Sequence, residues 1–507
     1  MLHIEEEAAR CLLCADAPCS KACKTGDPAR AIRAIRFGNG KLAGRWVAEC
    51  TDEDLEAAVR ACIHYDRPIR IKEMVAHVDA DLKSASRESG ISNPLQPSLA
   101  ITFCGIRCEN PFFLASSAVC TNYEMVARAF DAGWAGVFYK TICKQDIREV
   151  SPRFDAVKEG TPDFYAFRNM EQLSENPYAV DFDILRRLKH DYPTKVVVAS
   201  IMGQFEEEWI ELARMAEDAG CDAVELNFSC PQMRLAGMGS DVGQNPELVA
   251  TYTTYVKNSV KIPIIPKMTP NITHMRLPAM SAYFAGADAI SAINTIKSIT
   301  MTPEAAVSGR LTISGYSGRA VKPIALRYIH EIASNPVLNG SHGKRIELSG
   351  IGGIETWRDA LEFIQLGCRN VQVCTTVMQY GYRIIDDLIL GLENYLAERS
   401  LTSVEALVGE ALPCVVTPTD LDRDTIVYPK IDLDRCIGCG RCYMSCQDGG
   451  HQAIAFDTDE SLPTSGEKER RLRQPRIVGT KCVGCHLCRL VCPTGAIGIT
   501  KRINKKA

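Results

Sequence analysis

The chain has 507 residues, enough for two to four domains, of which one could be a large barrel. Its hydrophobic content of 46% and charged content of 24% are ordinary for a soluble protein, and its net charge of −4 gives no electrostatic reason to expect nucleic acid as a partner. The acidic start MLHIEEEAAR lacks an apolar core and no run of about eighteen apolar residues occurs, so we expect neither a secretory signal nor a membrane span. The 23 cysteines of a large leaderless chain indicate metal ligation in a reducing cytoplasm.

The first motif in chain order is CLLCADAPCSKAC, which contains Cys11, Cys14, Cys19 and Cys23. Thiolates this close in sequence could bind an iron–sulfur cluster, and the alternative is a set of four buried or free thiols. Either Cys50 or Cys62 could also complete a cluster. The stretches 29–40 and 52–65 have helical patterns, so we expect a small helical domain here.

Eight short β-branched or apolar runs then alternate with stretches of helical periodicity. The runs are 112–117, 136–141, 195–200, 223–229, 263–269, 287–294, 345–350 and 370–375. Eight strands alternating with helices over about 300 residues predict a (β/α)8 barrel of parallel strands. The alternative is a doubly wound open sheet, which the count of eight and the lack of G-x-G-x-x-G after any strand disfavour.

Polar residues follow the carboxyl ends of these runs, where barrels build their active sites. Two runs end in a lysine, Lys140 and Lys267, and a buried ammonium group is costly unless it faces an anion or an electron-rich ring. Either lysine alone would be taken for a rim side chain that reaches solvent. Together with the turn GIGG at 350–353 and the CTT at 374–376, where barrels bind phosphate through backbone N–H groups, they indicate a flavin site.

The long loop after the fourth run begins with Cys230 and is rich in glycine and methionine, which is typical of a loop that moves. A thiol has a pKa near 8.5, so Cys230 would be protonated at neutral pH and could act as a general acid. The alternative is a buried structural cysteine. We accept that alternative for seven other cysteines, namely Cys104, Cys108, Cys120, Cys143, Cys221, Cys368 and Cys414.

Eight cysteines near the C-terminus repeat the spacing C-x2-C-x2-C-x3-C, which is typical of two [4Fe–4S] clusters. Three close thiolates bind one cluster and the fourth reaches the other. The expected ligand sets are Cys436, Cys439 and Cys442 with Cys492, and Cys482, Cys485 and Cys488 with Cys446. We therefore expect a helical domain over 1–94, the barrel over 95–400, a linker over 401–430 and a two-cluster domain over 431–507.

Several motifs carry a resemblance to a known family. ELNFSCP with a downstream GMG-x3-GQ, then KMTPNIT, AINT, SGYSGRAVKPIALR, SGIGGIE and VQVCTTV, resemble the FMN barrel of the dihydropyrimidine dehydrogenases. That family is related to the dihydroorotate dehydrogenases. CIGCGRCYMSCQDGGHQAI is similar to its C-terminal ferredoxin domain, and CLLCADAPCSKAC to the opening of its N-terminal cluster domain.

The resemblance implies roles for individual residues. Cys230 matches the proton donor to C5 of uracil or thymine, with hydride delivered to C6 from N5 of FMN. Asn227, Asn294 and Thr295 match residues that hydrogen-bond the pyrimidine. The matches to FMN contacts are Ala115, Ser116, Lys140, Thr141, Lys267, Gly318, Gly352, Gly353, Cys374 and Thr375.

The chain departs from the larger enzymes of this family at three places. Gln232 stands where they carry a histidine, and the stretch SIMGQFEEEW lacks an asparagine that they use on the pyrimidine. The N-terminal domain is truncated, because their FAD and NADPH domains and most of a second cysteine set are missing. The chain thus resembles a bacterial iron–sulfur/FMN subunit with an added N-terminal cysteine motif.

Because no dinucleotide fingerprint is present, we expect electrons from a partner flavoprotein or a ferredoxin, passed through the clusters to FMN. The resemblance implies a homodimer or a hetero-oligomer. Three hypotheses follow: reduction of uracil or thymine to the 5,6-dihydro form, reduction of another cyclic amide or activated C=C on the same fold, and electron transfer by a barrel without catalysis.

Overall fold

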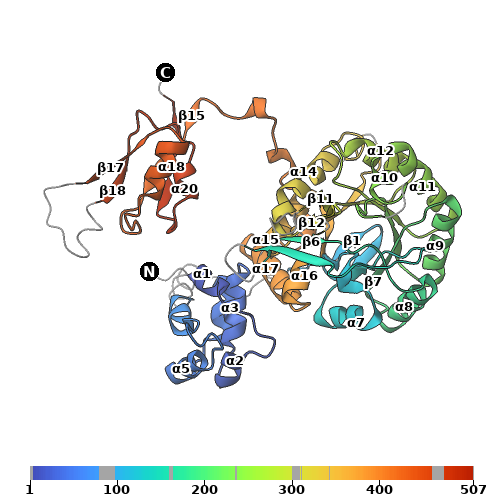
Figure 1. Cartoon of the computed structure of the whole chain (residues 1–507), viewed down its shortest axis with the longest axis horizontal. Coiled ribbons are helices and arrows are strands. Elements are labelled where there is room, and N and C mark those ends of the chain that lie inside the picture. Colours follow the sequence, from blue (N-terminus) through green and yellow to red (C-terminus); the bar gives the residue numbers. More distant parts are fainter. Residues whose placement is uncertain are drawn as a thin grey trace. The chain divides into compact units, whose positions relative to one another are not determined.

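The computed structural model describes residues 4–78, 97–158, 164–233, 237–299, 309, 311–341, 343–458 and 473–505. The chain divides into two compact units, Met1–Cys414 and Val415–Ala507. Figure 1 shows the first unit as a helical N-terminal part and a barrel, and the second as a small domain of short strands and helices. The domain boundaries expected from the sequence stay a prediction, and residue 94 lies outside the described residues.

The first unit contains a closed barrel of eight strands, all paired in parallel. In barrel order the strands are β10 (Ala289–Ala292), β13 (Glu347–Ile351), β14 (Cys368–Val373), β3 (Phe112–Leu114), β4 (Gly136–Phe138), β7 (Val196–Ile201), β8 (Ala223–Asn227) and β9 (Ile264–Lys267). Each strand overlaps one of the eight predicted runs, and β7, β13 and β14 extend one or two residues beyond theirs. The prediction of a (β/α)8 barrel is confirmed, and the open sheet is excluded because the sheet closes.

The helices that follow the strands pack around the barrel (Figure 1). They are α7 (Tyr123–Ala132), α8 (Tyr178–Asp191), α9 (Glu206–Asp218), α11 (Pro246–Ser259), α12 (Arg276–Phe284), α14 (Lys322–Ala333), α15 (Trp357–Gln365) and α17 (Ile384–Glu398). Their apolar faces and the strand side chains form one continuous core, in which Trp134, Trp209 and Phe363 are fully buried. Each barrel strand is buried on both of its faces. This explains why the predicted runs are continuously apolar and do not alternate between apolar and polar residues.

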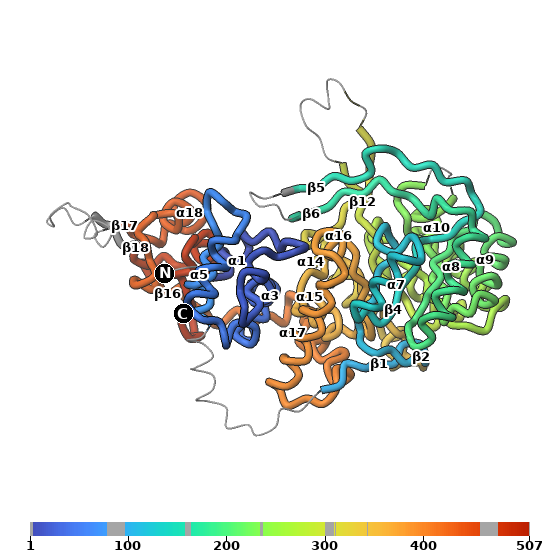
Figure 2. Tube along the Cα trace, turned by 90° about the horizontal axis from the view of Figure 1, so that it is seen from below, coloured from blue at the N-terminus to red at the C-terminus, as the bar shows by residue number. Residues whose placement is uncertain are grey.

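A second sheet of four antiparallel strands is built from two long strand-to-helix connections. Its order is β11 (Ile296–Ser298), β12 (Ser314–Ser317), β6 (Phe164–Asn169) and β5 (Phe154–Lys158). In Figure 2 these strands run along one edge of the barrel, opposite the hairpin of β1 (Ile101–Phe103) and β2 (Ile106–Cys108). This sheet was not predicted, and it brings residues of 154–158 and 164–169 to the cavity at the carboxyl ends of the barrel strands.

The N-terminal part consists of short helices around a core of its own. They are α1 (Ile4–Ala9), α2 (Pro18–Ala22), α3 (Pro28–Arg36), α4 (Gly40–Ala43) and α5 (Asp52–Arg60). The side chain of Asp27 caps α3, which starts with Pro28, and Thr51 and Asp54 form a capping box on α5. The two predicted helices are confirmed as α3 and α5. Both end before their periodic stretches do, α3 at Arg36 and α5 at Arg60.

The described residues of the second unit form three two-stranded sheets and include two α-helices. The strand pairs are β15 (Thr425–Ile426) with β20 (Ile503–Asn504), β16 (Pro429–Ile431) with β19 (Ile497–Ile499), and β17 (Ile454–Thr458) with β18 (Arg473–Ile477). The helices α18 (Arg441–Gly449) and α20 (Leu487–Leu490) each carry cysteines of one motif. The small core of the unit is made largely of cysteine side chains, including Cys442, Cys446 and Cys488, so bound clusters would complete it.

Candidate active site and cluster sites

One cavity of about 1180 Å³ opens at the carboxyl ends of the barrel strands. Every barrel residue singled out from the sequence lines it. These residues are Ala115, Ser116, Lys140, Thr141, Asn227, Cys230, Lys267, Asn294, Thr295, Gly318, Gly352, Gly353, Cys374 and Thr375. They come from all parts of the barrel, and the parallel closure of the sheet brings them together.

A row of hydroxyl and amide groups forms one side of this cavity. The hydroxyl of Thr141 lies 3.0 Å from that of Ser116 and 2.9 Å from that of Ser200, and it accepts a hydrogen bond from the Asn227 amide at 2.9 Å. Asn227 in turn accepts from the Ser229 hydroxyl at 2.9 Å, and Asn294 donates to that hydroxyl at 2.8 Å. Each amide nitrogen carries a second hydrogen, so Asn227 and Asn294 are oriented side chains that can still donate to a ligand.

The two lysines are buried and each faces a glutamate. The Nζ atom of Lys140 lies 2.7 Å from an oxygen of Glu171, and that of Lys267 lies 3.5 Å from an oxygen of Glu225. Glu225 is fully buried inside the barrel and also accepts hydrogen bonds from Ser200 and Ser291. These partners offset the cost of burying two ammonium groups at the cavity wall.

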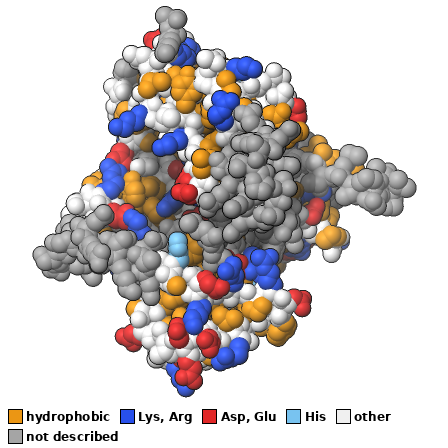
Figure 3. All heavy atoms as spheres, turned by 90° about the vertical axis from the view of Figure 1, so that its left-hand side faces the viewer, with side chains coloured by type: hydrophobic (Ala, Val, Ile, Leu, Met, Phe, Trp, Pro, Cys, Tyr) orange, Lys and Arg blue, Asp and Glu red, His pale blue; other side chains and the backbone are white. Residues whose placement is uncertain are grey.

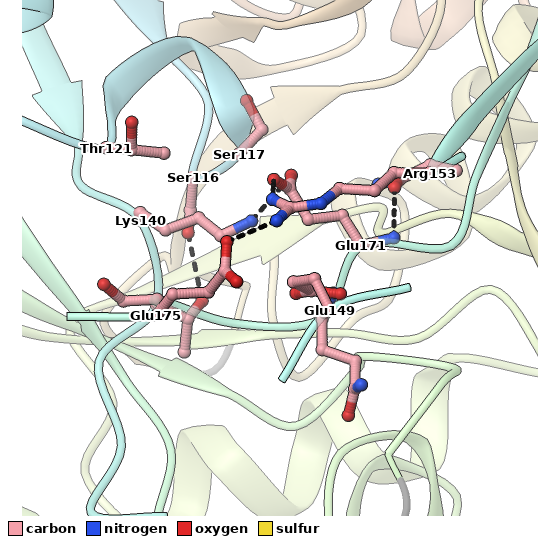
Figure 4. Close-up of polar contacts among 12 residues, drawn as sticks. Ser116, Ser117, Thr121, Lys140, Glu149, Arg153, Glu171 and Glu175 are labelled. Atoms are coloured by element: carbon pink, nitrogen blue, oxygen red, sulfur yellow. Dashed lines mark hydrogen bonds and ion pairs between the residues drawn. The ribbon is translucent and has the colours of Figure 1, made fainter. Parts of the chain in front are cut away.

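The hairpin of β5 and β6, with the loop before it, supplies a second charged group beside Lys140. Figure 4 shows Arg153 directed at Glu171, 3.3 Å away, and at Glu175, 2.5 Å away. Glu149 lies nearby and accepts from the backbone N–H of Gln172. Burial raises the pKa of Glu149, although the Gln172 hydrogen bond and the charge of Lys140 lower it. Lys140 is thus held by Glu171, which follows the β5–β6 hairpin and is distant from Lys140 in sequence.

Cys230 is 6% exposed and lies three residues beyond Asn227, where β8 ends. Burial raises the pKa of its thiol, while its hydrogen bond to the backbone at Gln232 and the nearby charges of Lys140 and Lys267 lower it. The loop returns to this cysteine, because the backbone N–H of Ser240 donates to its carbonyl oxygen at 2.9 Å. A side chain at Gly239 would place its Cβ 2.3 Å from the same oxygen. A protonated thiol is therefore held at the cavity wall.

Two glycines form a cradle at the end of β13. A Cβ atom on Gly352 would meet Ala325 at 2.8 Å, and one on Gly353 would meet the carbonyl oxygen of Gly318 at 2.8 Å. Both glycines have positive φ angles, of 129° and 77°. In addition, the Oε1 atom of Gln372 is buried at this cavity without a hydrogen-bond partner among the described residues. A ring with amide N–H groups and a phosphate tail, such as FMN, fits these donors, acceptors and open backbone.

Sequence reasoning missed three residues that line the same cavity: Asn169, Glu171 and Gln372. Asn169, at the end of β6, provides a third asparagine at the cavity. The stretch SIMGQFEEEW, where the larger enzymes carry an asparagine, has none. The signal for Asn169 was the run FYAFRN, a short strand pattern in a region to which no element was assigned. Gln232 also lines the cavity, and its Nε2 atom donates to the backbone oxygen of Asn169.

The N-terminal cysteines lie near one another in two places. Burial, together with the nearby Cys11, Cys62 and Cys14, raises the pKa of Cys19 to about 11. Burial likewise raises the pKa of Cys11, which Cys14 and Cys62 also influence. Cys23 instead lies with its sulfur 3.3 Å from that of Cys50. Cys62 thus lies near Cys11 and Cys19, and Cys23 contacts Cys50, while the cluster set of Cys11, Cys14, Cys19 and Cys23 expected from the sequence stays a prediction.

The C-terminal cysteines line two separate cavities. The first is lined by Cys446, Cys482, Cys485 and Cys488, and the second by Cys436, Cys439, Cys442 and Cys492. These are the two crossed ligand sets expected from the spacing. Among the described residues no group of three or more His, Cys, Asp or Glu could hold a single metal ion. The thiolates of a [4Fe–4S] cluster bind different iron atoms, so they do not have to converge on one point.

Comparison with known proteins identifies both parts of this arrangement. Residues 98–396 match the family model of dihydroorotate dehydrogenase, and residues 429–499 match that of a 4Fe-4S dicluster domain. The chain belongs to the dihydroorotate dehydrogenase family. It is a flavin- and iron–sulfur-dependent oxidoreductase of the dihydropyrimidine dehydrogenase type, acting on a CH–CH group, with FMN and [4Fe–4S] clusters as cofactors.

The chain is also similar to individual proteins. The chain is 51% identical over 375 residues to the NAD-dependent dihydropyrimidine dehydrogenase subunit PreA of Escherichia coli (strain K12), covering 73% of this chain and 90% of that protein. It is 37% identical over 341 residues to the chloroplastic dihydropyrimidine dehydrogenase (NADP(+)) of Arabidopsis thaliana, covering 64% and 80%. It is 35% identical over 318 residues to the catalytic subunit of dihydroorotate dehydrogenase B (NAD(+)) from Pyrococcus abyssi, covering 62% and 99%. None of the described helices of this family member is long and apolar enough to cross a membrane.

Proposed function

We propose that this oxidoreductase reduces a pyrimidine base, uracil or thymine, to its 5,6-dihydro form. The observation that carries the proposal is that Cys230, Asn227, Asn294 and Thr295 line the same cavity as the glycine cradle and both lysines. A pyrimidine ring presents amide donors and acceptors in a fixed plane, and oriented asparagine side chains can pair with both.

Each of these residues has a distinct task in the proposed reaction. Asn227 and Asn294 hold the ring by hydrogen bonds, and Thr295 lies beside them with its N–H donating to Asn294 at 2.7 Å. Cys230 holds a proton on Sγ and transfers it to C5 of the ring as a general acid. FMN, when bound, supplies the hydride for C6. Lys140 and Lys267 provide positive charge at the cavity wall, which favours an anionic reduced ring.

The test is a half-reaction under anaerobic conditions. The protein is reduced stoichiometrically with dithionite and mixed with uracil, and the return of the oxidised flavin absorbance is followed together with dihydrouracil formation. Cys230→Ala should slow this step by about 10²- to 10⁴-fold, because a general acid contributes a factor of that size. Cys143→Ala, which removes a buried thiol whose pKa is influenced by Cys230, should keep the native rate and the native FMN content. Full uracil turnover by Cys230→Ala would sink the proposal.

A second candidate keeps the reaction and changes the substrate to another cyclic amide or an activated C=C compound. It is motivated by Gln232, whose side-chain amide donates to the backbone oxygen of Asn169. The same amide lies beside Gly315. A Cβ atom on Gly315 would be 3.2 Å from Nε2 of Gln232 and 2.4 Å from the Thr295 hydroxyl. A glutamine here changes the hydrogen bonds offered to the ring. A reduced enzyme that ignores uracil and thymine but is oxidised by such a compound would select this candidate.

Electrons are proposed to come from a separate flavoprotein or a ferredoxin. The names of two relatives describe them as subunits, one of an NAD-dependent dehydrogenase. The two crossed C-terminal sets support a pair of clusters that accept single electrons. Cys11, Cys14, Cys19 and Cys62 are proposed to hold a further cluster. Bleaching of the flavin by NADH alone, without a partner protein, would contradict the need for a donor.

A further inference from the structure

Two cysteines of the N-terminal part are left outside the proposed cluster set. The sulfur atoms of Cys23 and Cys50 lie 3.3 Å apart, and both are free thiols. Across the described ranges of the chain this is the one hydrogen-bonded contact between two cysteines. Cys23 is 6% exposed, and Cys50 is half-buried.

The contact does not depend on the sulfur atoms alone, because the two chain segments that carry them are bound to each other. The backbone N–H of Asp27 donates to the carbonyl of Trp46 at 2.7 Å. The Thr25 hydroxyl donates to the carbonyl of Glu49 at 2.9 Å, and the backbone N–H of Lys24 donates to Asp54 at 3.1 Å. These bonds flank both cysteines and hold the thiols next to each other in the folded chain.

The local packing also favours a close approach of the two segments. A Cβ atom on Gly26 would lie only 2.4 Å from the Cys50 sulfur and 2.5 Å from the carbonyl of Trp46. Only a glycine therefore fits between the cysteines. Cys50 precedes α5, whose first turn is fixed by the capping box of Thr51 and Asp54, so its position is set by a rigid helix start.

A second [4Fe–4S] cluster at Cys23 and Cys50 would lack two of its four ligands. The carboxylate of Asp54 is occupied by the hydroxyl groups of Thr25 and Thr51, at 2.9 and 2.8 Å, and by the N–H of Lys24. The other nearby thiols belong to the group of Cys11, Cys14, Cys19 and Cys62. A [4Fe–4S] cluster takes four cysteines, and the pair offers two.

We propose that Cys23 and Cys50 form a reversible intramolecular disulfide, with a low-molecular-weight disulfide as the oxidant. The half-buried sulfur of Cys50 attacks the oxidant, forms a mixed disulfide, and one thiol leaves. The sulfur of Cys23 then attacks that of Cys50, the protein disulfide forms, and the second thiol leaves. Two electrons pass from the pair to the oxidant, and the protons of the two cysteines end on the two released thiols. The sulfur atoms must approach from 3.3 Å to a bond length of about 2.05 Å.

This bond would join the segment after α2 to the residue that precedes α5. It closes a loop between residues 23 and 50 that includes α3, the helix that contacts the barrel. Because a disulfide constrains the unfolded chain, oxidation would hold the cluster-bearing helices of the N-terminal part together while leaving Cys11, Cys14, Cys19 and Cys62 free to bind iron.

The test uses the full-length protein with its cofactors, purified anaerobically and treated with oxidised glutathione. After alkylation of the remaining thiols and digestion with trypsin, mass spectrometry should find peptide 22–24 linked to peptide 46–60, and dithiothreitol should abolish the linked species. Cys221, which is buried away from other thiols, should be recovered alkylated in the same sample.

Iron analysis separates the disulfide from a cluster at the same cysteines. Cys23→Ala and Cys50→Ala should retain the iron and acid-labile sulfide of the native protein, whereas Cys62→Ala should lose about four iron atoms per chain. Loss of about four iron atoms in either Cys23→Ala or Cys50→Ala would make the pair cluster ligands and overturn the inference. Absence of the linked peptide in the oxidised native protein would overturn it as well.

Discussion

Two opposing effects act on the pKa of the Cys230 thiol. Burial raises the pKa of its thiol, whereas the hydrogen bond at Gln232 and the charges of Lys140 and Lys267 lower it. The net shift is upward, so the thiol stays protonated through neutral pH. The two lysines are themselves balanced by Glu171 and Glu225, which limits how far they can favour the thiolate. The residue is therefore suited to donate a proton and not to act as a nucleophile.

The pH dependence of substrate reduction should report this thiol. Because the protonated form is active, the rate of flavin reoxidation by uracil should be level near neutral pH and fall as pH rises above the ordinary range of a thiol. Stopped-flow measurements between about pH 6 and 10 would show the alkaline limb. Cys230→Ser should be slower and lack that limb, because a hydroxyl does not ionise there. An identical limb in both proteins would assign it to another group.

Helix α3 is attached to helix α17 of the barrel by a buried ion pair. The Nε atom of Arg33 lies 2.7 Å from an oxygen of Asp387, with side chains 12% and 3% exposed. The amide of Asn39 adds a hydrogen bond to the Asp387 carbonyl at 2.9 Å. Burial raises the pKa of Asp387 to about 6, although Arg33 lowers it. The carboxylate is therefore costly to keep charged in this place, and Arg33 offsets that cost.

Removing the arginine should weaken the attachment of the N-terminal part. Arg33→Met leaves a buried carboxylate unpaired, which costs about 3 to 5 kcal/mol. The raised pKa means that native Asp387 binds a proton more readily than in the unfolded chain, so the stability it contributes is present at low pH and is lost as pH rises through about 6. The melting temperature of Arg33→Met should thus fall further below that of the native protein at pH 8 than at pH 5.

Lys41→Met is the matched control for this prediction. Lys41 pairs with Glu398 at 3.0 Å across the same two parts of the chain, but the side chains are 75% and 46% exposed. An exposed pair contributes between about 0 and 1 kcal/mol, so this variant should melt close to the native protein. Equal losses in the two variants would contradict the role given to burial.

The whole chain combines a two-electron site with one-electron carriers. In the second unit the fourth cysteine of each motif lies at the cavity of the other motif. Each cluster site is therefore built from both motifs. On the face drawn in Figure 3, Lys and Arg side chains are interspersed with Asp and Glu. This mixture agrees with the net charge of −4.

The crossed ligand sets give a test at this scale. Cys446→Ala should remove the cluster of Cys482, Cys485 and Cys488, although Cys446 belongs to the other motif in sequence. Electron paramagnetic resonance of the dithionite-reduced protein should then lack the signature of two interacting clusters and show one. Cys414→Ala, which removes an exposed cysteine outside both motifs, should leave the spectrum unchanged. Retention of both clusters in Cys446→Ala would refute the crossing.

Much of this molecule could be predicted from local patterns in the sequence. The eight strands of the barrel and the lysines and glycines at their ends follow from periodicity and position, because parallel strands place their carboxyl ends at one face. The crossed sets of Cys446 and Cys492 follow from spacing, because the fourth cysteine of a C-x2-C-x2-C-x3-C run ligates the other cluster of a two-cluster domain. Such features depend on neighbours within a few residues.

Other features depend on contacts between distant segments, and only the tertiary structure decided them. Glu171 meets Lys140, and Asn169 reaches the cavity, because β6 pairs with β12 on one side and with β5 on the other in one particular register. Cys62 joins Cys11 and Cys19, and Cys50 meets Cys23, because α5 packs against the segments around α2. No local spacing encodes these pairs, since each results from the packing of elements that the chain brings together only when it folds.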